Sequence, residues 1–236
     1  MKKLLPLLLA AACILSSCSF LPPGKGWTKE LSDGFCLFYQ TANQQGSFQG
    51  NYILTVTLPA RELPADVRNR LIQLPMSSKP SFNGMTSVYP DDITVHFLVT
   101  SDIHQIRDLL GPGLVESSSL EIPEDSQGYF LLYQEKDNRD RIDIETCEMR
   151  WRGISLKHKI YIPGHLDSGS SSFDDLFLSP RQPRREDYQS RSGISMHLLI
   201  YDNDTMLYFL HEGAAYCYAL HSSDPGVVHE FADSIS

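Results

Sequence analysis

Over most of the chain beyond residue 50, apolar residues recur at every second position, which is the pattern of β-strands with one buried face. The clearest alternating segments are 52–58, 93–99 and 154–162. Two later segments, 196–200 and 206–210, are apolar on both faces and flank an Asp-Asn-Asp turn at 202–204. They predict a hairpin in the centre of a sheet, and 215–220 predicts a further strand beside it.

The alternation changes phase between residues 141 and 151. Ile142 and Ile144 are apolar at even positions, whereas Met149 and Trp151 are apolar at odd positions. An extra residue in one strand of a pair shifts the phase in this way, so we expect a bulge or bend near Glu145.

Helical spacing of apolar residues predicts three short helices, within 64–74, 103–110 and 225–235. Ser101 is expected to cap the second helix, and Asp224 followed by proline is a strong start for the third. Strands outnumber helices, so the predicted fold class is α+β, predominantly an antiparallel β-sheet with a few short helices.

The first 18 residues have the pattern of an export signal. Two lysines are followed by an apolar run over 4–15, which ends in Leu15-Ser16-Ser17-Cys18. This ending resembles the lipobox of bacterial lipoproteins, which is an aliphatic residue, two small residues and a cysteine. The resemblance implies cleavage before Cys18 and attachment of acyl chains such as palmitate to Cys18. A retained membrane span is the weaker alternative, because the run is shorter than the about 20 residues that a bilayer requires.

The residue after the lipobox bears on localisation. Within the lipoprotein family of Gram-negative bacteria, an aspartate there implies retention at the inner membrane, and this chain has Ser19. The resemblance therefore implies a protein of the cell envelope that is lipid-anchored at the outer membrane and faces the periplasm or the surface. Its first expected partner is the membrane itself, bound through Cys18.

The leader also sets the expected domain boundaries. Residues 1–17 would be the signal peptide, 18–34 a lipidated cysteine and a flexible Pro- and Gly-containing tether, and 35–236 a single β-rich globular domain. Removing 1–17 takes away two lysines and no acidic residue, so the formal charge of −9 becomes −11. Such an acidic chain is not expected to bind nucleic acid.

Three cysteines remain in the expected globular domain: Cys36, Cys147 and Cys217. An oxidising envelope compartment permits one disulfide between two of them, and the spacing does not select the pair. The alternative is three buried thiols that pack as small hydrophobic side chains. The chain has no CxxC motif, so it predicts neither a zinc knuckle nor a thioredoxin-like site.

Two segments are expected to be exposed loops, 76–84 and 179–193. The second stands out on an acidic chain because it carries four arginines: Arg181, Arg184, Arg185 and Arg191. We expect a solvated loop, and the alternative is a contact site for an acidic protein partner or an anionic glycan. A further candidate contact surface is an exposed platform of strand tyrosines, Tyr201, Tyr208, Tyr216 and Tyr218, although half-buried sheet positions are the more common role.

One short motif suggests catalysis. The sequence Asp167-Ser168-Gly169-Ser170 resembles the Asp-Thr/Ser-Gly signature of pepsin-like and retroviral aspartic proteases, in which two aspartates share a proton to activate water. The resemblance implies Asp167 as the catalytic carboxylate. The chain lacks a second signature and an apolar strand directly before Asp167, so we expect a polar loop here.

Metal binding is not predicted. His158, His165 and Asp167 lie close in sequence but match no tight ligand spacing. His158 shares the apolar face of its strand, which favours a core histidine, whereas His165 lies in the polar loop beside Asp167.

The sequence as a whole favours a non-catalytic cell-envelope lipoprotein that binds a ligand or supports an assembly, without a cofactor. An envelope protein or a glycan would be its partner. One alternative is a hydrolase centred on Asp167, with His165 as a neighbour. The other is a surface-exposed adhesin or antigen.

Overall fold

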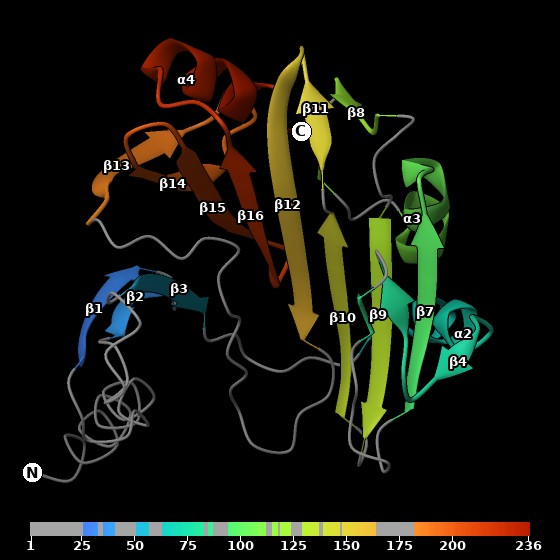
Figure 1. Ribbon diagram of the computed structural model, residues 1–236. Coiled ribbons are helices and arrows are strands. Elements are labelled where there is room, and N and C mark those ends of the chain that lie inside the picture. Colours follow the sequence, from blue (N-terminus) through green and yellow to red (C-terminus); the bar gives the residue numbers. More distant parts are fainter. Residues whose placement is uncertain are drawn as a thin grey trace, which may run out of the picture. The chain divides into compact units, whose positions relative to one another are not determined.

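The computed structural model (Figure 1) describes the chain in segments. They are 26–32, 35–40, 51–56, 63–82, 85–86, 94–111, 115–117, 119–123, 129–136, 139–146, 148–163 and 182–236. The chain divides into two compact units: residues 1–57 with 170–182, and residues 58–169 with 183–236. This division differs from the single globular domain that the sequence suggested from residue 35.

The first unit contains a three-stranded antiparallel sheet. Its strands follow one another in the order β1 (Gly26–Ser32), β2 (Phe35–Gln40) and β3 (Asn51–Val56). The first strand lies in the segment that we expected to be part of a flexible tether. Gly26 lies opposite Gln40 at one end of the β1–β2 pair, and Ser32 lies opposite Phe35 at the other end. This pairing with β2 accounts for the extended conformation of residues 26–32.

The second unit is built on one large antiparallel sheet. Its main strand order is β13-β14-β15-β16-β12-β10-β9-β7-β4, with β11 paired to β12 and β8 paired to β11. The bounds are β4 Met76–Ser77, β7 Thr94–Thr100, β8 Leu120–Glu121, β9 Tyr129–Lys136, β10 Arg139–Thr146, β11 Met149–Trp151, β12 Ile154–Pro163, β13 Arg184–Gln189, β14 Ser195–Ile200, β15 Thr205–His211 and β16 Ala214–Leu220. A separate pair consists of β5 (Ser81–Phe82) and β6 (Met85–Thr86). The segment 76–84, expected to be a loop, therefore contains two short strands.

Three short helices accompany this sheet among the described residues: α2 (Ala65–Leu71), α3 (Ile103–Leu110) and α4 (Pro225–Asp233). In Figure 1, α4 lies toward the β13–β16 part of the sheet, and α2 and α3 lie toward β7. Asp224 caps α4 as predicted, with its side chain accepting hydrogen bonds from the amides of Gly226 and Val227. The predicted α+β class, dominated by antiparallel sheet, is confirmed.

The cap of α3 differs from the prediction by one residue. Asp102, not Ser101, accepts the hydrogen bond from the His104 amide at 2.9 Å. A charged carboxylate is a stronger acceptor than a hydroxyl at the positive end of a helix, which accounts for capping by Asp102.

The phase change near Glu145 corresponds to a one-residue irregularity between β10 and β11. Glu145 lies opposite Lys159, whereas Met149 lies opposite Leu156. The chain therefore advances four residues from β10 to β11 while β12 advances only three. Thr146 secures this point, because its hydroxyl accepts a hydrogen bond from the amide of His158 at 3.0 Å. The predicted bulge is confirmed.

The main core covers one face of the sheet. Even-numbered apolar residues of β10, β12 and β16 point to this face and meet the apolar sides of all three helices. Phe231 of α4, for example, makes edge-to-face contacts with Trp151 and Tyr218. Tyr208, Tyr216 and Tyr218 are at most 1% exposed, so the exposed tyrosine platform is ruled out by burial within a central sheet.

Candidate ligand-binding cavity

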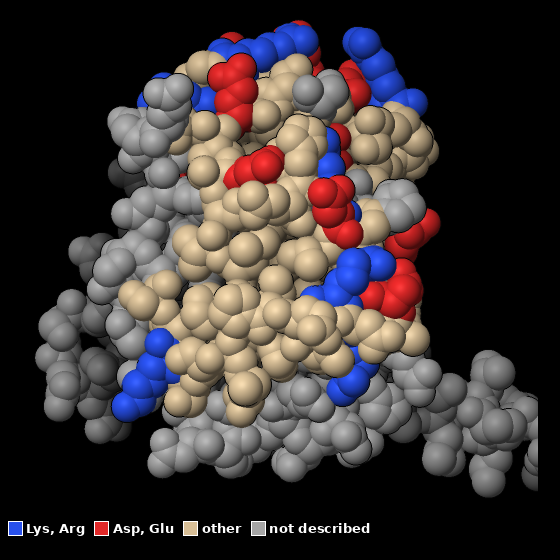
Figure 2. Space-filling view, turned by 90° about the vertical axis from the view of Figure 1, so that its right-hand side faces the viewer, with Lys and Arg blue, Asp and Glu red and all other residues tan. Residues whose placement is uncertain are grey.

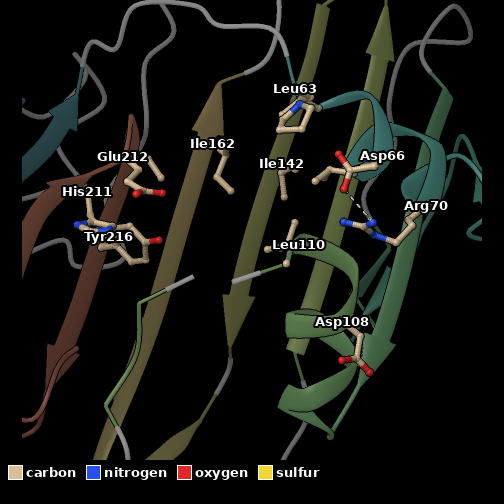
Figure 3. Close-up of a pocket in the computed structure, with 14 residues that line it drawn as sticks. Leu63, Asp66, Arg70, Asp108, Leu110, Ile142, Ile162, His211, Glu212 and Tyr216 are labelled. Atoms are coloured by element: carbon tan, nitrogen blue, oxygen red, sulfur yellow. Dashed lines mark hydrogen bonds and ion pairs between the residues drawn. The ribbon is translucent and has the colours of Figure 1, made fainter. Parts of the chain in front are cut away.

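A cavity of about 550 Å³ opens in the second unit between α2 and α3 on one side and the β15–β16 hairpin on the other (Figure 3). Its walls come from the start of α2, the end of α3, the adjacent strands β10 and β12, and the hairpin between β15 and β16. The lining residues are Leu63, Pro64, Asp66, Val67, Arg70, Asp108, Leu110, Gly111, Ile142, Ile162, His211, Glu212, Ala214 and Tyr216. This volume lies within the range of small-molecule sites.

The floor of the cavity is apolar because it continues the core face of the sheet. Ile142 and Ile162 lie directly opposite each other on β10 and β12, and the next pair on the same face is Ile144 and Ile160. The inner pair is fully buried within the core, whereas Ile162 is only half-buried. The helices therefore leave part of this apolar face open to a ligand.

A hydrogen-bonded arginine joins the two helices at one side of the cavity. The Arg70 guanidinium donates from Nη1 to the Asp66 carboxylate at 3.0 Å, one helical turn earlier on α2. Its Nε donates to the carbonyl oxygen of Leu109 near the end of α3, at 2.8 Å. Arg70 therefore holds the two helix ends together and keeps this wall in place.

The Asp66 carboxylate stays ionised over a wide pH range. Its hydrogen bond from Arg70 lowers its pKa below the ordinary aspartate value. The side chain is largely exposed, so this effect concerns its charge at the cavity mouth and not the stability of the fold.

The opposite side of the cavity is a tight hairpin. His211 and Ala214 pair at its base, and both central residues have positive φ, 47° at Glu212 and 76° at Gly213. This is the backbone requirement of a type I′ turn, which matches the twist of antiparallel strands. The turn brings His211 and Glu212 to the cavity opposite Asp66, as Figure 3 shows.

The lining residues carry carboxylates, one imidazole and one guanidinium beside aliphatic side chains. They provide an apolar floor with a few charged groups at its margins, which is the usual composition of a small-molecule site.

Most of the residues proposed from the sequence fall outside the part of the chain that the structure describes. Asp167, His165, Cys18, Cys147 and Arg181 are outside the described residues, and so is the side chain of Cys36. Cys217 is fully buried in β16. The aspartic-protease-like motif, the lipidation and the disulfide therefore remain predictions.

The basic segment 179–193 is not a continuous loop, because Arg184–Gln189 forms the edge strand β13. Three of its arginines are in ion pairs: Arg184 with Glu186, Arg185 with Asp187, and Arg191 with Asp233. Arg184 and Arg185 therefore belong to an edge strand, where charged side chains discourage pairing with another sheet.

Several described histidines have hydrogen-bond partners or a core position. His158 is completely buried and stacks on Tyr218, and burial lowers its pKa to about 3. His197 hydrogen-bonds to Asp187, His221 to Asp204, and His229 to Glu186. Within the described segments, no group of three or more His, Cys, Asp or Glu residues is arranged to bind a metal ion.

A second surface, toward β7, carries exposed apolar side chains. Figure 2 shows the side of the molecule toward β7, where a broad area without charged residues is bordered by acidic and basic side chains. Met76 of β4 and Val99 of β7 are 66% and 45% exposed. Neither residue lines the cavity, and small-molecule sites are usually concave, so the cavity is the stronger candidate.

No protein-family model matches the chain, and a search of curated proteins finds no significant relative. None of the helices in the described part of the chain has the length and apolar character needed to cross a bilayer.

Proposed function

We propose that this protein is a lipid-anchored, non-catalytic binding protein of the bacterial cell envelope. Its second unit would bind a small, largely apolar ligand in the cavity between α2, α3 and the β15–β16 hairpin. The observation that carries the proposal is the half-buried Ile162 beside Ile142, where the core face of the sheet continues into an open cavity. Burying this apolar surface under a ligand would supply the main driving force.

The lipid anchor is tested by acylation. When cells that express the full chain are grown with radioactive palmitate, we expect label on the wild-type protein and none on Cys18→Ser. The matched control is Cys36→Ser, which removes another cysteine and should keep the label. Label that persists in Cys18→Ser would contradict anchoring at this residue.

Blocking the cavity tests the binding site. The measurement is the fluorescence of N-phenylnaphthylamine, a neutral dye that becomes bright in apolar surroundings, titrated with the full chain carrying Cys18→Ser. Adding Ile162→Trp fills the floor of the cavity, and we expect the dye to bind about tenfold or more weakly.

Val99→Trp is the matched control, because it introduces the same side chain at a strand position that is 45% exposed and is not part of the cavity. This variant should bind the dye like the parent. Thermal unfolding of both variants separates lost binding from lost folding. If Ile162→Trp remains folded and binds the dye normally, the cavity is not the binding site.

A further inference from the structure

We propose that the cavity binds a straight hydrocarbon chain of about twelve carbons with a small polar head group, laid across the strands of the sheet. This inference rests on the proposed binding function and specifies the shape of the ligand. The observation that carries it is a single row of lining side chains that crosses four adjacent strands, β10, β12, β16 and β15. The row consists of Ile142, Ile162, Ala214 and His211.

The register of the strands produces this row. Ile142 lies directly opposite Ile162, and Ala214 lies directly opposite His211. The antiparallel register of β12 and β16, continued by one residue, places Ala214 beside Ile162. Side chains of directly opposite residues project from the same face of a sheet, so the four side chains stand in line on the core face.

The length of the row sets the length of the ligand. Adjacent strands lie about 4.8 Å apart, so the three steps from β10 to β15 make a row of about 14 Å. An extended chain of single bonds advances roughly 1.2 Å per bond, so about twelve carbons cover the row. A ring or a strongly branched molecule with the same number of carbons would be shorter and would leave part of the row uncovered.

The chemistry along the row also suits a ligand with a polar head group. The middle of the row is apolar, and Ile162 is the half-buried residue whose side chain a hydrocarbon chain would cover. His211 offers imidazole nitrogens at one end. The hydrogen-bonded pair of Asp66 and Arg70 lies toward the other end, beyond Ile142 (Figure 3). The head group would therefore remain at an end of the row, in contact with water, while the chain covers the isoleucines.

The experiment compares straight and cyclic alcohols, whose uncharged head group minimises the influence of charged lining residues. Hexanol, octanol, decanol, dodecanol and cyclododecanol are each used to displace N-phenylnaphthylamine from the full chain carrying Cys18→Ser. We expect affinity to rise about twofold per added methylene up to dodecanol, because each methylene covers more of the row from one side only. Dodecanol should bind about tenfold more tightly than cyclododecanol, which has the same number of carbons.

Ala214→Leu tests the row directly, because a larger side chain at this position would interrupt it between Ile162 and His211. Dodecanol should bind about tenfold more weakly to this variant, whereas octanol, which fits on the remaining part of the row, should change by less than about twofold. Thermal unfolding verifies the fold, and Ala214→Val provides a smaller obstruction with a smaller effect in the same direction if the leucine is not accommodated. The matched control is Ala65→Leu, the same substitution at an exposed position of α2 outside the lining, and it should preserve the affinity for dodecanol.

The outcomes separate the two proposals. The straight-chain inference is wrong, while the apolar binding site stands, if cyclododecanol binds as tightly as dodecanol or if affinity stops rising at octanol. The same conclusion follows if the folded Ala214 variants change the affinities for octanol and dodecanol to the same extent, or if Ala65→Leu weakens dodecanol as much as Ala214→Leu does. If none of the alcohols displaces the dye and Ile162→Trp has no effect on it, the binding site itself is wrong and the inference falls with it.

Discussion

Phe231→Ala is expected to lower the free energy of unfolding of the second unit by about 3–5 kcal/mol. Phe231 is fully buried, and its ring lies 5.3 Å from the rings of both Trp151 and Tyr218, at angles of 77° and 71°. Truncation removes both edge-to-face contacts and leaves a cavity under α4 that the rigid sheet cannot close. Denaturant unfolding followed by near-ultraviolet circular dichroism measures the loss.

Glu230→Ala is the matched control for this substitution. Glu230 is the preceding residue of α4, its side chain is 58% exposed, and its ion pair with Arg152 lies at the surface. Removing a surface ion pair is expected to change the free energy of unfolding by less than about 1 kcal/mol. If Phe231→Ala costs no more than this control, α4 does not pack on the sheet through Phe231.

The sequence predicted the sheet well because burial of one face leaves a period-two pattern that is readable locally. The β14–β15 hairpin and the strands at 154–163 and 214–220 follow that pattern. Even the phase change near Glu145 was informative, since it marked the extra residue between β10 and β11. Each of these signals lies within one short segment.

The edge strand β13 was missed because its sequence carries the opposite signal. Arg184–Gln189 is composed of charged and polar residues with one tyrosine, which indicates a loop when it is considered alone. Its tertiary contacts hold it in place: Tyr188 stacks on His229 of α4 and donates a hydrogen bond to Asp233 at 3.0 Å. Such contacts depend on α4, which is far away in the sequence.

The cavity could not be predicted from the sequence, since its walls come from separate segments between residues 63 and 216. Asp66 and Arg70 offered one local signal, an acid and a base spaced one helical turn apart. That spacing is common on helix surfaces, so it does not identify a site. Only the folded sheet reveals that the open apolar floor lies beside them.

A second large effect is expected from Glu116, a carboxylate with almost no solvent exposure. Its Oε2 accepts hydrogen bonds from the Arg107 guanidinium at 2.7 and 3.1 Å, while its Oε1 has no hydrogen-bond partner among the described residues. Burial raises the pKa of Glu116 from 4.5 to about 7, although the charge of Arg107 opposes this shift. The ionised form is therefore poorly accommodated in the folded protein.

The raised pKa makes the contribution of Glu116 to stability fall as pH rises. Below about pH 4.5 the group is protonated in both the folded and unfolded states, and its contribution is constant. Between that pH and about 7, the folded state retains a proton that the unfolded state has lost, so ionisation increasingly favours unfolding. The difference between the two pKa values corresponds to about 3 kcal/mol.

Glu116→Gln should remove this pH dependence, because the amide resembles the protonated carboxyl in shape and cannot ionise. We expect the variant to match the wild type near pH 4.5 and to exceed its free energy of unfolding by about 3 kcal/mol at pH 8. Denaturant unfolding at both pH values measures the difference. Glu121→Gln, which changes an exposed glutamate, should follow the wild type at each pH.

Arg107→Met distinguishes burial from the ion pair as the source of the effect. Removing the guanidinium removes the interaction that opposes the shift, so the pKa of Glu116 should rise further and the loss of stability should extend to higher pH. Adding Glu116→Gln to Arg107→Met should abolish that loss, since no buried charge remains. If Glu116→Gln is instead less stable than the wild type at pH 8, the ion pair outweighs burial and the Glu116 pKa is not raised.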